Sequence, residues 1–454
     1  MEKRENFGSR LAVISAMAGS AIGLGNIWRF PYMVGEHGGA AFVLIYILST
    51  LIVSLPVFIA EVTIGRRSRT SAYGSFSALA PGKPVWKIVG LFAVAIPTII
   101  ASYYSVIGGW SLAYLGKSCA LSIVKTAPDN VGSIFTGFIS STWAPVIAHL
   151  VFLLTCTVIV ALGVRSGIEK FSKITIPTLF VLIIAMIIYS VTLPGAGAGV
   201  RYLLKPDFSQ LTARSFAYAM GQSFYSLSLG MGAIVTYGSY VSRSENIVAS
   251  AAGTAVSDLV FAILAGLAIM PAVFAGGMEP GAGPGLIFQS IPYIFSTLGT
   301  KLPVLSSAVS IIFFLAIVVA AMTSCISIME VGVAYLKDKF GVKRPLGSIV
   351  IFLICGILGI LCSLSFGPLS GFTIRGMGLF DLFDWFSSNF LLLLMGFAVV
   401  IFTGFVMKKE DVMDEVTNSG TKKFNVKIFN TVYFLIKWVA PVAVLLIFIT
   451  NFIL

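Results

Sequence analysis

The sequence predicts an all-α polytopic membrane protein with eleven transmembrane helices, and three observations lead to this fold class. Of the 454 residues, 57% are hydrophobic and only 11% are charged, whereas soluble domains carry about 25% charged residues. The mean hydropathy is +0.99. Apolar stretches of ~20 residues, enough to cross ~30 Å of hydrocarbon, recur along the whole chain. These stretches are too long and too evenly apolar for barrel strands, so helices are expected.

Eleven apolar spans can be assigned, with boundaries good to about ±3 residues. They cover residues 11–34, 40–64, 87–115, 143–163, 171–193, 215–240, 247–275, 304–336, 346–366, 382–406 and 430–454. Residues 1–454 are expected to form one transmembrane domain, because the sequence has no long linker or low-complexity tract. The first span lacks a small-residue cleavage site and is expected to be a retained helix rather than a signal peptide.

The net charge of +12 is interpreted as a topology signal rather than as a nucleic-acid site, because the basic residues lie in short loops and no recognition motif accompanies them. With the N-terminus in the cytoplasm, 22 of the 30 Lys and Arg residues fall on the cytoplasmic side and 8 outside. The C-terminus is then external. The five cysteines lie in or beside apolar stretches and are interpreted as small hydrophobic residues, not as a disulfide framework or metal cluster.

The first and sixth spans do not resemble simple membrane helices. The first contains GSAIGLGN (19–26) and the sixth contains SLSLGMG (226–232). Each has glycines and polar side chains near mid-membrane, and because the spans are five apart they run in opposite directions. Gly-interrupted spans at matching positions predict an inverted repeat with a binding site at the breaks. The alternative is that Gly19 and Gly23 form a close-packing face and that both breaks are kinks.

A break inside the bilayer frees N–H and C=O groups, which cost several kcal/mol each if unpaired. Released carbonyls suit a small cation, and released N–H groups at the start of a half-helix suit a carboxylate. An amino acid with a sodium ion beside its carboxylate satisfies both sets.

Four segments resemble the neurotransmitter:sodium symporter family. They are RLAVISAMAGSAIGLGNIWRFP (10–31), IASYYSVIGGW (100–110), GQSFYSLSLGMGAIVTYGSY (221–240) and AAMTSCISIM (320–329). The resemblance covers nearly the whole chain, and the count of eleven helices is similar to short bacterial members. It implies the leucine-transporter fold, with repeats at about 10–193 and 215–406, helices 1 and 6 unwound at mid-membrane, and an added helix at about 430–454. Gly-interrupted spans in two inverted repeats are a feature of these symporters themselves, so the breaks and the family resemblance are not independent indications of the fold.

The resemblance implies two sodium ions as co-substrates. The first sodium site is expected to use the Ala21 carbonyl, the side chains of Asn26, Ser226 and Asp258, and the substrate carboxylate. The family often has Asn at the place of Asp258, and a register one residue earlier would put Ser257 there. A carboxylate in an apolar span is costly unless it faces a cation, which favours Asp258; alternatively, its side chain reaches the cytoplasmic interface. Chloride-dependent members of the family need an anion near this site. A fixed negative charge at Asp258 resembles the arrangement of chloride-independent members, so chloride is not expected.

The second sodium site implied by the family is built from carbonyls and hydroxyls. It is expected to use the carbonyls of Gly19, Ile22 and Ala320 and the hydroxyls of Thr323 and Ser324. Neutral oxygens suit a hard monovalent cation better than a soft metal. Alternatively, the two hydroxyls bond back to their own helix.

The implied substrate is a hydrophobic amino acid. Its carboxylate is expected at the N–H groups of Leu24 and Gly25 and the Tyr104 hydroxyl. Alternatively, Tyr104 is only an interfacial anchor and the neighbouring Tyr103 takes its part. Its ammonium is expected at the carbonyls of Ala21 and Tyr225 and at the Ser228 hydroxyl. The side-chain pocket is expected to comprise Gly23, Ile100, Tyr225, Met231, Ser324 and Ile328, with Ser226 beside it.

Met231 between Gly230 and Gly232 departs from the leucine-selective archetype, which has an aromatic ring at this place. A flexible thioether makes an adaptable wall, and the expected pocket holds no charged residue. We therefore expect a bulky hydrophobic or aromatic L-amino acid, tryptophan or tyrosine foremost.

Gates are expected at both ends of the site. Outside, Arg29 is expected to pair with Asp384, with Gln222 nearby and Asp381 as the rival partner. Inside, Arg4 is expected to pair with Asp338, with Phe7 and Tyr240 packing nearby. Gly167 and Pro177 in the fifth span are similar to a family motif thought to let that helix unwind.

The sequence thus predicts sodium-driven uptake of an amino acid across the cell membrane by alternating access, with no enzymatic activity. Proton coupling through Asp258, Glu61 or Glu330 is the alternative mechanism, although interhelical hydrogen bonding is the simpler role for the two glutamates. A channel or receptor is a distant alternative, because no pore-lining polar rings or ligand domain are visible. The expected partners are the substrate and the lipid bilayer, and the oligomeric state stays open.

Overall fold

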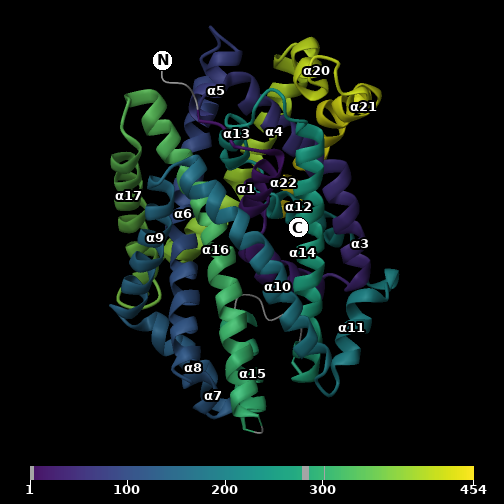
Figure 1. The fold of residues 1–454 in the computed structure, drawn as a ribbon. Coiled ribbons are helices and arrows are strands. Elements are labelled where there is room, and N and C mark those ends of the chain that lie inside the picture. The colour runs from purple at the N-terminus through teal and green to yellow at the C-terminus, as the bar shows by residue number, and fades with distance from the viewer. Residues whose placement is uncertain (1–4, 279–285, 301, 454) are drawn as a thin grey trace.

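The computed structural model describes residues 5–278, 286–300 and 302–453, and the regular secondary structure in these ranges is helical (Figure 1). Nine of the described helices are long and apolar enough to cross a membrane, and a pair bent by 53° forms a tenth candidate. The sixth predicted span is present as two short helices. The helices therefore overlap all eleven predicted spans.

The spans follow one another in chain order with short connections. They consist of α1 (Arg10–Ala21) with α2 (Phe30–Glu36), α3 (Ala40–Ser49) with α4 (Leu55–Ser68), α6 (Val85–Cys119), α9 (Ala144–Ala161), α10 (Lys170–Val191), α12 (Ala213–Ser226) with α13 (Ala233–Gly238), α14 (Ile247–Ala275), α16 (Pro303–Phe340), α17 (Arg344–Leu364), α18 (Leu379–Phe386) with α19 (Leu392–Ile401), and α21 (Lys423–Phe434) with α22 (Ala440–Ile453). The remaining α-helices are α5 (Ala72–Leu79), α7 (Ser122–Lys125), α8 (Pro128–Ser140), α11 (Ala196–Leu204), α15 (Ile291–Gly299) and α20 (Lys409–Thr417).

Wider π-helical turns join or extend several of these helices. They lie at Gly25–Arg29, Thr50–Ser54, Val164–Glu169, Leu286–Ser290, Ser387–Leu391, Phe402–Val406 and Leu435–Val439, and a 3₁₀ turn lies at Phe208–Gln210. Such turns are common at functional sites.

The first span is broken as predicted. Ser9 caps the start of helix α1: its hydroxyl accepts a hydrogen bond from the Ala12 N–H, which is an ordinary N-cap. The α-helix ends at Ala21, and Ile22 has extended backbone (φ −72°, ψ 104°). The chain turns helical again at Gly25–Arg29 and continues into α2.

The sixth span is also broken, and more widely. Helix α12 ends at Ser226 and α13 begins at Ala233. Between them Ser228, Gly230 and Gly232 have positive φ, a conformation that only glycine adopts freely. At Gly230 a Cβ atom would lie 2.3 Å from the Leu392 carbonyl oxygen. Glycine therefore lets this break pack directly against the tenth span.

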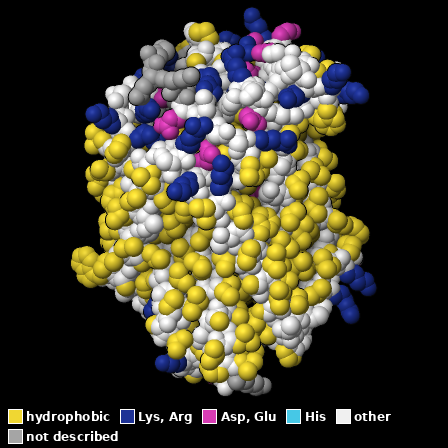
Figure 2. All heavy atoms as spheres, in the orientation of Figure 1, with side chains coloured by type: hydrophobic (Ala, Val, Ile, Leu, Met, Phe, Trp, Pro, Cys, Tyr) yellow, Lys and Arg dark blue, Asp and Glu magenta, His cyan; other side chains and the backbone are white. Residues whose placement is uncertain are grey.

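The two broken spans lie within the bundle, between the long helices α6 and α16 and helix α14 (Figure 1). The outer surface is apolar: exposed side chains such as Val181, Ile188 and Ile357 are each more than 60% accessible. Figure 2 shows this apolar belt, with Lys and Arg gathered mainly at the end that holds the N-terminus, α5 and α20. This distribution is the one expected for a bilayer with a basic cytoplasmic face.

The fifth span is intact in this structure. A π-helical turn over Val164–Glu169 leads into α10, which continues through Pro177 to Val191. The unwinding suggested by the motif of Gly167 and Pro177 is therefore not present in this conformation.

Candidate functional site

A small cavity of about 20 Å³ lies where the two breaks meet, which is room for about one water molecule. It is lined by Ser20, Ala21, Gly23, Gly25, Ile100, Tyr104, Tyr225, Ser226, Ser228, Met231, Ser324 and Ile328. The predicted substrate residues are thus all in this lining except Leu24. Ser20 lines the cavity although the sequence analysis did not include it.

Leu24 still contributes through its backbone. Its N–H donates to the Tyr104 hydroxyl at 3.3 Å, so the two groups expected to hold a carboxylate lie side by side. The neighbouring Tyr103 has another role, because its hydroxyl accepts a hydrogen bond from Ser387 at 3.2 Å. Helix α6 therefore presents Tyr104, and Ile100 one turn earlier, to the cavity.

A polar cluster joins both breaks to α14. The Asn26 amide Nδ2 donates to Asp258 Oδ1 at 2.7 Å, and the Ser226 hydroxyl donates to Asp258 Oδ2 at 2.8 Å. The Tyr46 hydroxyl donates to Asp258 Oδ2 at 3.2 Å. All four side chains are buried. A desolvated carboxylate surrounded by donors is stabilised by charge-assisted hydrogen bonds, and its oxygens are hard ligands that suit an alkali cation.

Asp258, rather than Ser257, belongs to this cluster. The Ser257 hydroxyl donates to the Gly253 carbonyl one turn earlier on α14 at 2.8 Å. Asp258 is fully buried, so it does not reach the cytoplasmic interface. Sequence reasoning missed Tyr46, because one tyrosine in a long apolar run resembles a core residue.

A second oxygen cluster forms between the first break and α16. The Thr323 hydroxyl lies 3.3 Å from the Ile22 carbonyl and 2.9 Å from the Ala320 carbonyl. Gly19 packs here as well: a Cβ atom at this position would lie 3.5 Å from Thr323 Cβ. The Ser324 hydroxyl instead donates to the Ser20 carbonyl at 3.2 Å, on the cavity side. Gly19, Ile22, Ala320 and Thr323 are therefore neighbours, with the Thr323 hydroxyl bonded both across to the first break and back to its own helix, while Ser324 lies on the cavity side.

The walls of the cavity approach too closely for larger residues. A Cβ atom at Gly23 would lie 2.3 Å from Ser324 Oγ, and one at Gly25 would lie 3.3 Å from the Tyr225 ring. The Ser228 hydroxyl donates to the Ser20 carbonyl at 2.8 Å. Polar groups of the two breaks therefore satisfy one another in this compact state, and a ligand would exchange these hydrogen bonds for its own.

Glu61 supports the sixth-span break from α4. Its Oε1 accepts a hydrogen bond from the Gly230 N–H at 2.7 Å. The N–H of Gly230 lost its helical partner when the span unwound, and an unpaired buried donor costs about 1–3 kcal/mol. Glu61 thus replaces that lost bond, which is the interhelical role that was one expectation for it.

On one side of the two breaks, a cavity of about 260 Å³ is lined by both residues of the expected outer gate, Arg29 and Asp384. They form no ion pair within 4.0 Å among the described residues. The Arg29 guanidinium lies instead over the Tyr225 ring, 4.6 Å from its centroid, and Asp384 accepts from the Ser388 hydroxyl at 3.1 Å. Gln222 donates to the Gly25 carbonyl at 3.3 Å. Asp381, the rival partner, is likewise unpaired with Arg29.

On the opposite side the path is packed shut. The Phe7 ring meets Tyr237 and Tyr240 edge-on, with centroids 5.7 and 6.0 Å apart. The Asp338 carboxylate accepts from the Ser71 N–H at 2.5 Å and from Thr70 at 3.1 Å. Arg4, the expected partner of Asp338, lies outside the described residues.

Glu330 belongs to this closed side. Its carboxylate pairs with Arg344 at 2.6 Å and accepts from the Tyr240 hydroxyl at 2.6 Å. The role is a buried ion pair that joins α16, α17 and the segment after α13.

Comparisons with known proteins agree with this arrangement. The chain is 36% identical to a sodium-dependent transporter, YhdH, of Bacillus subtilis, over 99% of this chain and 98% of the relative. It is 35% identical to a sodium-dependent transporter of Haemophilus influenzae, with the same coverage. The crystal structure of MhsT in complex with L-phenylalanine matches with a TM-score of 0.89 and 42% identity, over 99% of this chain and 100% of that one.

A family model also matches nearly the whole chain, over residues 4–130 and 139–454. The match includes both breaks and the polar clusters around them. With its all-helical leucine-transporter fold and its sodium-dependent relatives, the chain belongs to the sodium:neurotransmitter symporter family.

Proposed function

We propose that this sodium-dependent symporter carries a hydrophobic or aromatic L-amino acid into the cell, with tryptophan and tyrosine favoured, and that it does not require chloride. The observation that carries the proposal is the apolar cavity between two opposed helix breaks, flanked by two separate oxygen clusters. Backbone N–H groups at the break suit a carboxylate, and the oxygen clusters suit alkali cations.

At the first site, sodium would bind the Ala21 carbonyl together with Asn26, Ser226 and Asp258. The amino acid's carboxylate would lie at the Leu24 and Gly25 N–H groups and the Tyr104 hydroxyl, close enough to share this sodium ion. Sodium and amino acid then raise each other's affinity by the same factor. The Asp258 carboxylate supplies the negative charge that chloride would otherwise supply.

At the second site, sodium would bind the carbonyls of Gly19, Ile22 and Ala320 with the hydroxyls of Thr323 and Ser324. This site connects the first repeat to α16 in the second repeat. A cation held here favours the conformation in which the two repeats are close together, which couples sodium binding to closure.

The substrate side chain would be bounded by Ile100, Tyr225, Met231 and Ile328, none of which is charged. The cavity of about 20 Å³ must widen to admit an amino acid. Met231 can make this room, because its unbranched side chain changes rotamer readily. The similar structure of MhsT in complex with L-phenylalanine supports an aromatic substrate.

In the membrane, the N-terminus would be cytoplasmic and the C-terminus external, because Lys and Arg concentrate in segments that this orientation puts inside. The apolar belt of Figure 2 would lie in the hydrocarbon of the cell membrane. Substrate would enter through the outer cavity beside Arg29 and leave past Phe7.

Uptake of labelled tryptophan into proteoliposomes tests the proposal. We expect uptake with external sodium and little uptake when choline replaces it, with no change when gluconate replaces chloride. Phenylalanine and tyrosine should compete, and glycine and glutamate should not. Strong competition by glycine or glutamate but not by phenylalanine would overturn the substrate class.

The Asp258→Asn variant adds a second arm to this experiment. It should lose transport or become chloride-responsive, because the neutral amide leaves the first cluster without its negative charge. Uptake by the wild type that follows pH and ignores sodium would favour the proton-coupled alternative through Asp258, Glu61 or Glu330.

A further inference from the structure

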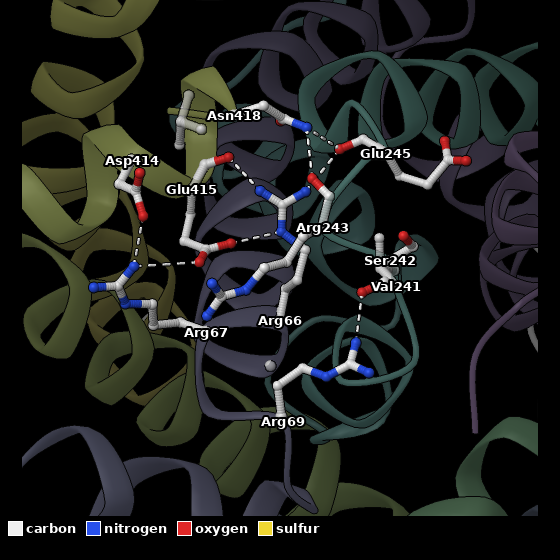
Figure 3. A network of polar contacts seen from close by, with 12 residues as sticks. Arg66, Arg67, Arg69, Val241, Ser242, Arg243, Glu245, Asp414, Glu415 and Asn418 are labelled. Carbon is white, nitrogen blue, oxygen red and sulfur yellow. Dashed lines mark hydrogen bonds and ion pairs between the residues drawn. The ribbon is translucent and has the colours of Figure 1, made fainter. Parts of the chain in front are cut away.

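A dense polar network joins α4 to α20 at the basic end of the molecule (Figure 3). Arg66 of α4 is only 1% exposed and Glu415 of α20 only 3%. Arg66 Nε donates to Glu415 Oε2 at 2.6 Å, and a second guanidinium nitrogen donates to the Glu415 backbone carbonyl. The third nitrogen donates to the Glu245 carbonyl at 2.7 Å. One buried guanidinium thus binds α20 and the segment after α13 at once.

The outer part of this network is more exposed. Arg67 pairs with Asp411 at 2.5 Å and with Asp414 at 2.6 Å, and both carboxylates are 40% exposed. The Asn418 amide, just after α20, donates to the carbonyls of Arg243 at 2.9 Å and Glu245 at 2.8 Å. Exposed pairs contribute little because water screens them, so Arg66 and Glu415 define the connection.

The same stretch of α4 is fixed to the broken sixth span. A Cβ atom at Gly65 would lie 1.9 Å from the Val235 carbonyl oxygen of α13, so the two helices touch backbone to backbone. Four residues earlier, Glu61 binds the Gly230 N–H in the break. Helix α4 and the inner half of the sixth span therefore form one body at the cytoplasmic side.

Helix α20 follows the tenth span, Leu379–Val406, after only two residues, Met407 and Lys408, whose backbone is extended. The outer part of that span carries Asp384, Ser388 and Asn389, which line the outer cavity. Its middle contacts the break, where Leu392 approaches Gly230. The tenth span therefore runs from the outer vestibule past the unwound sixth span, and a two-residue extended link joins it to the helix that holds Glu415.

We propose that Arg66 and Glu415 are positioning residues for transport: their buried ion pair fixes the cytoplasmic end of the tenth span to α4, so that movement at the cytoplasmic side repositions Asp384 at the outer vestibule. The inference rests on the proposed alternating access. It assigns to α20 the coupling of the two gates rather than contact with either ligand.

The chemistry of the pair suits this role. A guanidinium bound through several nitrogens has a fixed geometry, unlike a single-point lysine contact. Removing one partner of a buried pair leaves an uncompensated charge and is strongly unfavourable, so the pair stays formed while other contacts break. The contacts that cross to α16 and α17, at Asp338 and Glu330, are the ones that must open on the cytoplasmic side.

A reporter cysteine at Asn389 tests the coupling. Cys119 is the exposed native cysteine and the other four are buried, so Asn389→Cys in a Cys119→Ser background gives a single accessible thiol in the vestibule. Its rate of reaction with a membrane-impermeant maleimide is measured in proteoliposomes with sodium plus tryptophan and with choline alone. We expect Glu415→Gln to shrink the ratio of these two rates about fivefold or more, the ordinary lower range of coupling between two sites.

The control is Asp411→Asn, on the same helix, which removes an exposed pair and should leave the ratio unchanged. Thermal unfolding shows whether Glu415→Gln is folded. If it is not, Arg66→Lys is used, which keeps the positive charge but cannot bind through several nitrogens as the guanidinium does, and it should reduce the ratio in the same direction. Sodium-dependent tryptophan binding should persist in the variants of the Arg66–Glu415 pair while their uptake rate falls, and Asp411→Asn should change neither.

A folded Glu415→Gln variant, or else a folded Arg66→Lys variant, that keeps the full parental ratio would overturn the inference. A parental reporter whose rate ignores sodium and tryptophan would instead contradict the proposed alternating access itself.

Discussion

The two ends of the central site are built differently. On the outer side, Arg29 and Asp384 face a cavity of about 260 Å³ and are held by one cation–π contact and one hydroxyl bond. On the basic side, the packed rings of Phe7, Tyr237 and Tyr240 and the buried Glu330–Arg344 pair close the path, and the exposed Asp338 adds a hydrogen bond from the Ser71 N–H. The structure is therefore closed toward its basic end and hollow toward the opposite end, which in the proposed orientation face the cytoplasm and the outside.

The difference shows at which end stronger contacts must break during a transport cycle. Exposed charges contribute below ~1 kcal/mol and can part readily, whereas a buried pair holds until something replaces it. Ligands that bind in the breaks contact groups of both repeats, so their binding is suited to replace the contacts that the buried pair loses. Opening inward should then be the slow step, and opening outward the easy one.

Among the tests of this difference between the two ends, a substitution of Glu330 should have the largest effect on stability. Glu330→Gln leaves the Arg344 charge buried without its main partner, so we expect a loss of about 3–5 kcal/mol of stability. Thermal unfolding in detergent measures it. Glu5→Gln is the matched control, because Glu5 is 32% exposed and lies 3.7 Å from the same arginine. An equal effect of both changes would mean that burial is not what makes this end strong.

Phe7→Ala should have the next largest effect. It removes two edge-on ring contacts from a side chain that is 5% exposed, and truncating a core Phe costs about 3 kcal/mol or more. The cytoplasmic side should become accessible, which a maleimide reaction at Ser71→Cys in the Cys119→Ser background would report. Phe7→Leu, which keeps most of the apolar volume, should behave nearly like the parent protein. If the alanine variant shows no faster maleimide reaction at Ser71→Cys, Phe7 does not block access from this side.

Arg29→Met should affect stability least. The cation–π contact with Tyr225 contributes about 0.5–1 kcal/mol, and no ion pair with Asp384 is lost in this conformation. Tryptophan should nevertheless dissociate faster, because the outer cavity loses its cover. Measuring stability and dissociation on the same preparation separates the two effects, and Asp384→Asn should leave stability unchanged. A destabilisation as large as that of Glu330→Gln would remove the contrast between the two ends.

The sequence was informative where chemistry is unusual for a membrane span. Glycines beside Asn26, Ser226 and Ser228 predicted both breaks. The carboxylate of Asp258 in an apolar helix predicted a cation beside it, and the structure surrounds that carboxylate with hydrogen-bond donors. The family resemblance supplied the pairing of these positions across the chain. Long-range pairing of this kind follows from how spans pack, which a single sequence does not contain.

Other features could not be predicted for definable reasons. Tyr46 resembles a core residue until α3 brings its hydroxyl to Asp258. Arg66 lies in a basic run that suggests a solvated loop, yet packing on α20 buries it. The predicted pairing of Arg29 with Asp384 depends on the conformational state, and the state described here holds Arg29 on Tyr225. Sequence patterns indicate which groups are available, but not which partner each takes in one conformation.

Binding of labelled tryptophan to the purified protein tests the central claim most directly, since sodium and the amino acid are proposed to share the opened backbone of two spans. Tryptophan should bind when sodium is present. Saturating tryptophan should raise the affinity for sodium by the same factor by which sodium raises the affinity for tryptophan. Asp258→Asn should remove this coupling. Tryptophan affinity that is the same in sodium and in potassium would contradict the account.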